Sequence, residues 1–497
     1  MNAIGKMHLQ MDLLAVNLLR VRARRFAEAT GGKVKLATGC SGSDLVVLAL
    51  KALFEYWYIM FGVRLEIDHY FSVEHTAWKR DFIKDVVGPQ YIFNEMEELS
   101  KEPVRDCVSA ADVTLMTPHV FFCGVECDSV SPLSSWASSQ RNCVEGKQGA
   151  TGISADACMK FVSKFLPPIV CIENVKNLDA APAGQASNKA TIVKNLQELG
   201  YETSDSVLNA KNYGAAQRRP RIYLGAILPK QKIEGQESQT MTDLDAAPSR
   251  LRALRIPPLD LEDFLLDESD NRVQEFKQDK QDNSRKKQRK GDDYQVEHLQ
   301  MFSDLGLEWP PKYSQAFEDA MGFLNYSPRM MELAWLCLNV ADMKGGKSEY
   351  ARDLNMSIQW GDDSRGEAPC IICTSVIFLA RRMRLLSGIE AMFLQMWPMR
   401  GPHAQHLARY TQPQLMDLAG NAFNGAAVVA KFITIIMSHD WTSSMFEGPG
   451  ALDGDALVGE GDVEEVEAGD DVEFFEGMRL VEDACSSEEA EDDSDFD

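Results

Sequence analysis

The sequence predicts an α/β fold with a doubly wound, mostly parallel sheet. Within residues 34–228, short apolar runs bounded by turn residues alternate with longer segments of helical periodicity. This strand–helix alternation is typical of a parallel sheet with helices on both faces. At 497 residues, of which 45% are hydrophobic, the chain is long enough for two or three domains.

Five apolar runs are the expected strands, and four longer segments are the clearest helices. The strands are "VKLATGC" (34–40), "LEIDHYFSVE" (65–74), "VFFCGVEC" (120–127), "PPIVCIENV" (167–175) and "RIYLGAI" (221–227). The helices are "SDLVVLALKALFEYWYIMFG", "KATIVKNLQELGY", "SPRMMELAWLCLNVADM" and "NAFNGAAVVAKFITIIMSHDW". Ligands of such sheets bind beyond the carboxyl ends of the strands. The residues that follow three of these strands are therefore candidate site residues: Cys40–Asp44, Cys127 and Glu173.

The net charge of −24 is concentrated in one terminal segment. Residues 447–497 hold about 21 acidic residues and one basic residue, which leaves roughly 54 acids against 50 bases in residues 1–446. A nearly neutral body does not exclude a nucleic-acid partner. We expect the tail to be disordered, either as a solubilising appendage or as an interaction segment. The strongest basic cluster, "SRKKQRKG" (284–291), is either a phosphate or nuclear-import contact or a solvated loop.

The cysteines and the apolar runs indicate a soluble intracellular protein. The 11 cysteines are odd in number and scattered, which is typical of reduced thiols. "PCIICT" holds a Cys370-x-x-Cys373 pair without a second pair at zinc spacing, so we expect a buried strand there and no metal site. No apolar run approaches the ~20 residues of a membrane span. The opening segment is expected to be a surface helix, with a transit peptide as the alternative.

Several residues have chemistry that suits a site. The small residues of "ATGCSGSD" allow a ligand to approach the backbone at a helix start. Glu74 ends a strand, where it is either a ribose ligand or a surface carboxylate. Glu173 ends a buried strand, where desolvation raises a carboxyl pKa and suits proton donation to a ring nitrogen; a helix-capping charge is the alternative. Arg219 and Arg221 alternate before a strand and point the same way, toward an anion or solvent.

The order of these motifs resembles the cytosine-C5 methyltransferases that use S-adenosylmethionine. The matching segments cover most of residues 34–228 and 369–436: "CSGSD", "SVEHTAWKRDFI", "FNEMEEL", "CGVECDSVSPLSS", "FLPPIVCIENVKNL", "LGYETSDSVLNAKNYGAAQRRPRIYLGAI", "RRMRLLSGIEAMFLQMWP" and "LAGNAFNGAAVVAKF". The resemblance implies a Rossmann-like class I methyltransferase fold with a smaller target-recognition domain. It also implies methyl transfer to C5 of a flipped cytosine in DNA, with transfer RNA as the alternative substrate.

The resemblance assigns roles to individual residues. Cys127 matches the nucleophile, Glu173 the acid that contacts N3 and the exocyclic amine, and Arg219, with Arg221 beside it, the arginine that orients the base and the thiol. The implied S-adenosylmethionine contacts are Cys40, Ser41, Gly42, Glu74, Glu95, Asn421 and Ala422. The implied nucleic-acid contacts are Ser131, Asn174, Gln217, Thr374 and Ser375. No metal is implied.

The chain departs from the family pattern beside the nucleophile and in the cofactor loop. Val125, Glu126 and Asp128 replace the usual prolines and glutamine around Cys127. Two acids beside a thiol are expected to raise its pKa and reduce the thiolate fraction. "CSGSD" also lacks the usual aromatic residue and second glycine. These changes leave a third interpretation open, a catalytically weak homologue that binds cofactor or a partner.

The implied division of the chain has five parts. These are an N-terminal helix (1–33), the catalytic core (34–230), a variable target-recognition region with a basic, partly disordered loop (231–380), a return segment that completes the core (381–446) and the acidic tail (447–497). We expect a monomer, located in the nucleus rather than the cytoplasm.

Overall fold

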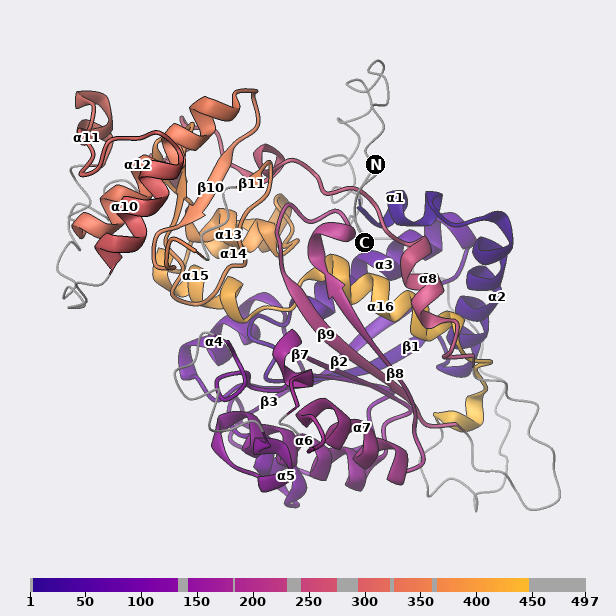
Figure 1. Ribbon diagram of the computed structural model, residues 1–497. Coiled ribbons are helices and arrows are strands. Elements are labelled where there is room, and N and C mark those ends of the chain that lie inside the picture. The colour runs from indigo at the N-terminus through magenta and orange to yellow at the C-terminus, as the bar shows by residue number, and fades with distance from the viewer. Residues whose placement is uncertain are drawn as a thin grey trace, which may run out of the picture.

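The computed structural model describes residues 3–132, 142–181, 184–229, 243–274, 294–321, 326–359 and 364–446. The basic segment 284–291 and the acidic tail 447–497 lie outside the described residues. Two lobes are visible in Figure 1, a large one built on the central sheet and a smaller one that contains α10, α11, α12, β10 and β11.

The large lobe is built on a seven-stranded sheet, which confirms the predicted fold class. Its strands, in sheet order, are β3 (Tyr91–Phe93), β2 (Glu66–Val73), β1 (Lys33–Gly39), β6 (Val120–Gly124), β7 (Ile169–Val175), β9 (Pro220–Ile227) and β8 (Glu202–Asn209). All neighbours pair in parallel except β9, which is antiparallel to both β7 and β8. The carboxyl ends of β1, β2, β6 and β7 therefore meet at one edge.

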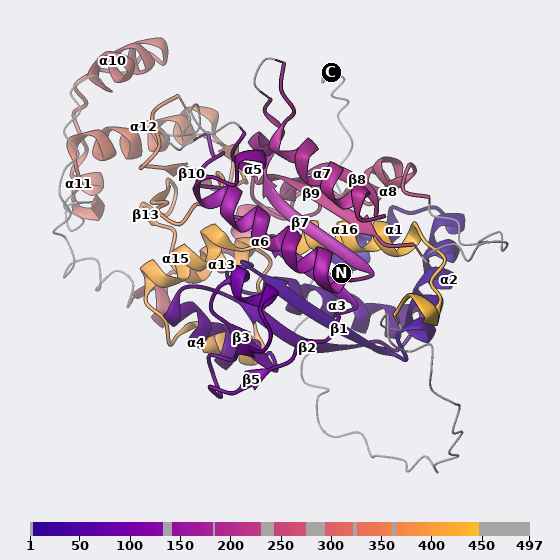
Figure 2. The same ribbon diagram turned by 90° about the horizontal axis from the view of Figure 1, so that it is seen from below.

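Helices cover both faces of this sheet, as Figures 1 and 2 show. One face carries α1 (Ala3–Leu9), α2 (Leu13–Ala29), α3 (Leu45–Phe61), α4 (Ala77–Val86), α8 (Ala247–Ala253) and α16 (Gly425–Met437). The other carries α5 (Cys143–Gly146), α6 (Gly149–Phe165) and α7 (Asn188–Glu198). The sequence predicted one helix in residues 1–33, and the structure has two. Because Leu19, Ala23 and Phe26 of α2 are buried, this helix belongs to the core and is not only a surface element.

The return of the chain to the large lobe is visible in Figure 1, where the yellow α16 lies among the indigo helices. All thirteen residues of α16 are buried, and Asn424 caps its first turn. Among the described residues, Gln412–Met437 is the one segment long and apolar enough to cross a membrane. However, 89% of its most apolar window is buried inside the fold, which is the environment of a core helix.

The smaller lobe contains a four-stranded antiparallel sheet and a group of helices. The strands are β11 (Ser364–Arg365), β10 (Tyr350–Asp353), β12 (Ile377–Leu379) and β13 (Arg384–Leu385). The helices are α10 (Tyr294–Asp304), α11 (Gln315–Met321) and α12 (Pro328–Lys344). A further group, α13 (Gly388–Leu394), α14 (Gly401–Leu407) and α15 (Gln412–Asn421), lies between the lobes, and β4 (Val104–Arg105) pairs with β5 (Asp112–Val113). The β12–β13 hairpin spans the predicted boundary at residues 380 and 381.

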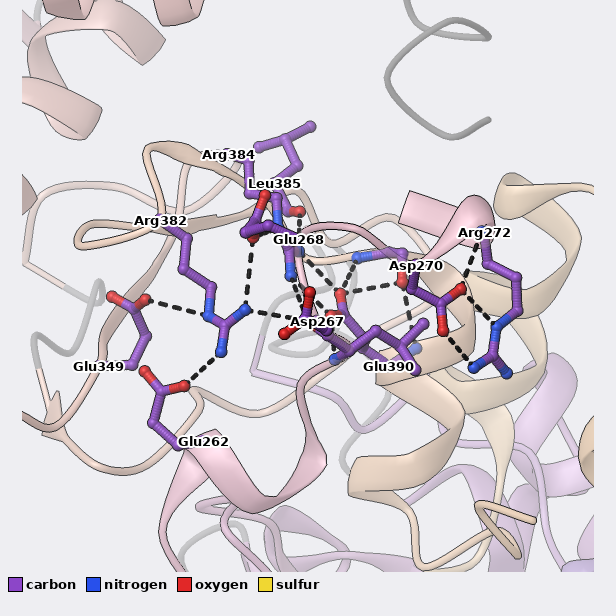
Figure 3. A network of polar contacts seen from close by, with 12 residues as sticks. Glu262, Asp267, Glu268, Asp270, Arg272, Glu349, Arg382, Arg384, Leu385 and Glu390 are labelled. Atoms are coloured by element: carbon purple, nitrogen blue, oxygen red, sulfur yellow. Dashed lines mark hydrogen bonds and ion pairs between the residues drawn. The ribbon is translucent and has the colours of Figure 1, made fainter. Parts of the chain in front are cut away.

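A buried ion-pair network stabilises the base of the smaller lobe, as Figure 3 shows. Arg384 donates two hydrogen bonds to Glu390, at 2.9 and 2.8 Å, and the two side chains are 4% and 0% exposed. The Glu390 carboxylate also accepts hydrogen bonds from the backbone N–H groups of Leu266 and Ser387. One carboxylate therefore joins the segment before α10, the β13 strand and the start of α13.

We expect Glu390→Gln to lower the free energy of unfolding by about 3 kcal/mol, because it removes the buried counter-charge of the Arg384 guanidinium and leaves only the partly exposed Glu268 as its acidic partner. Urea unfolding of the full chain measures this change. The matched control is Glu308→Gln, which breaks the exposed Glu308–Lys312 pair and should change stability by less than about 0.5 kcal/mol. Equal losses for the two variants would contradict a structural role for the buried network.

Candidate active site

The predicted nucleophile and acid lie on neighbouring strands of the sheet. Cys127 follows β6 by three residues, and Glu173 lies in β7, where it pairs with Gly124 of β6. Cys127 and Glu173 are both partly buried. The structure therefore brings the thiol loop and the carboxyl to the same edge, where the sequence analysis placed them.

Arg221 completes this group from the antiparallel strand β9. Its Nε lies 3.3 Å from Glu173 Oε1, and each of the two side chains is 13% exposed. Among the described residues, Glu173 Oε1 is buried without a hydrogen-bond partner. Burial raises the pKa of Glu173, and Arg221 and then Arg219 oppose that rise. A partly buried carboxyl with an unsatisfied oxygen is suited to a polar ligand group.

Arg219 lies close enough to act on Cys127 and Glu173, and its guanidinium is held by backbone carbonyls. Its guanidinium donates hydrogen bonds to the carbonyls of Ile371 at 2.8 Å, Gly420 at 3.0 Å and Ala422 at 2.7 Å. Arg219 therefore holds the loop before β12 against the turn before α16. Arg221, and not Arg219, forms the ion pair with Glu173.

The pKa of the Cys127 thiol is raised to about 11. Burial is the main cause, Glu173 and Asp128 add to it, and Arg221 and Arg219 oppose it. Of the two flanking acids, Asp128 has the larger effect on this thiol, and Asp128, Glu74 and Glu95 are the acids that act on Glu126. Asp128 therefore acts on the thiol in the direction expected for the flanking acids.

We expect Asp128→Asn to lower the pKa of Cys127 by about 0.5 unit, because it removes one like charge from the surroundings of the thiolate. Since the thiolate fraction below the pKa changes tenfold per unit, iodoacetamide should alkylate Cys127 about threefold faster at pH 8. Peptide mass spectrometry distinguishes Cys127 from the other cysteines. The comparison variant is Glu126→Gln, which should accelerate alkylation less than Asp128→Asn does, because Asp128 has the larger effect on the thiol; an equal or larger acceleration in Glu126→Gln would contradict the assignment.

The residues of the cofactor loop surround the start of α3. Asp44 adopts a left-handed conformation, with φ of 55°, in place of the family's second glycine. Its fully buried carboxylate accepts hydrogen bonds from the hydroxyls of Thr38, Ser41 and Ser72. Gly42 also has a positive φ, and a Cβ there would lie 2.8 Å from Asn421 O. The Asp44 carboxylate therefore holds the loop in place. Because Gly42 has no side chain, the loop can lie close to the turn after α15.

A cavity of about 230 Å³ opens beside this loop. Its lining includes two predicted cofactor contacts, Cys40 and Glu95, together with Glu126 from the loop of the nucleophile. Val73 and His75, which flank the buried Glu74, also line it. A cavity lined by the acidic residues Glu95, Glu97 and Glu126 beside the Cys40 loop suits a nucleoside with a cationic side chain. Asn421 is exposed, and its amide donates to Asp417, so its backbone rather than its side chain faces the loop.

The predicted nucleic-acid contacts divide into two groups. Ser131 and Thr374 are on loops at the exposed side of the site. Ser375 is buried and accepts the N–H of Ile372. Asn174 donates to Val125 O at 2.6 Å, and Gln217 is fully buried and accepts from Gln395. The second group therefore supports the loops around the site.

Sequence reasoning missed Cys370 as part of the site. The segment "PCIICT" is a loop and not the predicted strand. It places Cys370 Sγ 3.7 Å from Arg221 Nη2, and the two arginines lower the pKa of this thiol despite its burial. The paired cysteines were a signal, but the apolar residues between them favoured a strand. No group of three metal-ligand side chains occurs in the described part of the chain.

Comparison with known proteins identifies the family. Residues 91–435 match the C-5 cytosine-specific DNA methylase family. The chain belongs to this family. Methylases of this family use S-adenosylmethionine, so the cofactor prediction is confirmed.

Three curated relatives carry related methylase sequences. The chain is 24% identical over 431 residues to the DNA (cytosine-5-)-methyltransferase DMT5 of Cryptococcus neoformans. This alignment covers 81% of this chain and 17% of the relative. It is 34% identical over 80 residues to the type II methyltransferase M.Sau3AI of Staphylococcus aureus, covering 16% and 19% of the two chains. It is 25% identical over 175 residues to M.HhaI of Haemophilus parahaemolyticus, covering 34% and 48%. The matched segments thus span less than half the length of each relative.

Similar solved structures include the Entamoeba histolytica methyltransferase EhMeth, with 11% identity and a TM-score of 0.41 over 81% of this chain and 98% of that chain. The S. pombe Dnmt2 methyltransferase has 12% identity and a TM-score of 0.40 over 81% and 98%.

Proposed function

We propose that this methylase-family chain transfers a methyl group from S-adenosylmethionine to C5 of cytosine in DNA. The observation that carries the proposal is the meeting of Cys127, Glu173 and Arg221 at one edge of the sheet, beside the cavity that suits the cofactor. The DMT5 relative, which bears the name of a DNA methyltransferase, supports DNA as the substrate class.

The residues of the site perform the proposed reaction in a definite order. Cys127 Sγ, as the thiolate, adds to C6 of a flipped cytosine, while the Glu173 carboxyl shares a proton with N3 and accepts from the exocyclic amine. Arg221 holds Glu173 and lies near the thiol. S-adenosylmethionine supplies the electrophilic methyl group to C5. A base then takes the C5 proton, the electron pair of the C5–H bond re-forms the C5=C6 double bond, and the C6–S bond breaks with its electron pair on sulfur, which returns the thiolate.

Family membership does not separate a DNA substrate from transfer RNA. The test incubates the full chain with labelled S-adenosylmethionine and, separately, DNA and transfer RNA that contain unmethylated cytosine. The proposal predicts label in DNA that is absent with Cys127→Ala. Label in transfer RNA alone would indicate that transfer RNA is the substrate. Label in neither nucleic acid would favour the interpretation that the chain is a catalytically weak homologue. The expected nuclear location and monomeric state remain predictions.

A further inference from the structure

The cofactor cavity contains an acidic residue that the family pattern does not place there. Glu126 occupies a position where the family usually has a proline, and its side chain lines the cavity with Cys40, His75 and Glu95. The neighbouring Asp128 acts on the Cys127 thiol and is not among the residues that line the cavity. The two acids that flank the nucleophile therefore differ in their contact with the cavity.

Backbone contacts from two directions fix the orientation of Glu126. Its N–H donates to Ser154 Oγ of α6 at 3.1 Å, and its carbonyl lies 3.4 Å from Asn174 Nδ2 of β7. Asn174 also binds the carbonyl of Val125 at 2.6 Å. These contacts hold the backbone on both sides of Glu126 in the position where this residue lines the cavity.

The charges around the cavity leave an excess of acid. Glu95 and Glu97 line the cavity with Glu126, and the buried Glu74 lies next to it. The basic groups are His75, which is 59% exposed, and Arg80, whose guanidinium binds the carbonyls of Glu74 and His75. Burial raises the pKa of Glu126, His75 opposes that rise, and Asp128, Glu74 and Glu95 add to it. A bound cation would relieve this repulsion, whereas a neutral ligand of the same shape would not.

We propose that Glu126 makes the cofactor cavity discriminate between S-adenosylmethionine and its demethylated product, and so is a specificity-determining residue. When the S–CH₃ bond breaks, its electron pair stays on sulfur, which changes from a sulfonium cation to a neutral thioether. The attraction of the Glu126 carboxylate is therefore present before transfer and lost after it, which favours exchange of product for fresh cofactor. This inference rests on the proposed cofactor site.

Isothermal titration calorimetry without nucleic acid tests the inference on the full chain. The ligands are S-adenosylmethionine, its neutral product S-adenosylhomocysteine, and sinefungin, which carries an ammonium in place of the sulfonium. In Glu126→Gln, the affinity ratio of each cationic ligand to the neutral one should fall about three- to tenfold, mainly through weaker binding of the cations. Asp128→Asn, the matched acid on the other side of Cys127, should keep the wild-type ratio.

Three results would overturn the inference. They are an unchanged ratio in Glu126→Gln, equal weakening of all three ligands, and a similar drop in Asp128→Asn. Wild-type chain that binds none of the ligands would overturn the cofactor site itself. Failure to methylate DNA, with the ratio changed as expected, would instead reject only the proposed substrate.

Discussion

Replacing Cys127 by alanine is expected to lower the rate of methyl transfer by about four orders of magnitude or more. The reason is that C5 of cytosine becomes nucleophilic only after a thiolate has added to C6, and alanine offers no group that can form this bond. Transfer of label from S-adenosylmethionine to cytosine-containing nucleic acid measures the change.

The control for this variant is Cys107→Ala, which removes an exposed thiol outside the site. It should retain wild-type activity. Circular dichroism of both variants should match that of the wild type, because neither substitution adds volume. Methylation by Cys127→Ala at more than a small fraction of the wild-type rate would place the nucleophile at another residue.

Glu173→Gln should lower the rate about a hundred- to a thousandfold. Glutamine keeps the size of the side chain but cannot exchange a proton with N3, so the negative charge that develops in the ring during thiolate addition is left without compensation. It also removes the counter-charge of Arg221, 3.3 Å away. Single-turnover assays with saturating cofactor report this step.

A matched substitution tests whether the effect is local. Glu202 is an exposed carboxylate at the start of the edge strand β8, and Glu202→Gln should be indistinguishable from the wild type. If Glu173→Gln retained the wild-type rate, the carboxyl would not share a proton with the base, and the role given to it would be wrong.

The sheet was predictable where strands are buried on both faces. The runs at 34–40, 65–74, 120–127, 167–175 and 221–227 all became strands, because a strand covered by helices on both faces of the sheet needs continuous apolar residues. The edge strands were not recognised. β3 has three residues, and β8 (Glu202–Asn209) is polar and half-exposed, so neither has the apolar pattern of a central strand.

The site was predictable in its residue types and less so in its geometry. The alternation of Arg219 and Arg221 places both on one side of the chain, but only Arg221 lies within β9, opposite β7. Arg219 precedes the strand and donates hydrogen bonds to three backbone carbonyls. The sequence alone could not place these carbonyls near Arg219. The position of the Glu126 backbone likewise depends on contacts from α6 and β7, which are distant in sequence.

Covalent trapping tests the account most directly. The full chain is incubated with S-adenosylmethionine and DNA or RNA that contains 5-fluorocytosine, in which the C5 substituent cannot be removed and the C6–S bond persists after methyl transfer. The account predicts an adduct that peptide mass spectrometry locates on Cys127 and that Cys127→Ala lacks. An adduct on a different cysteine, such as Cys370 or Cys373, or no adduct with either nucleic acid, would contradict it.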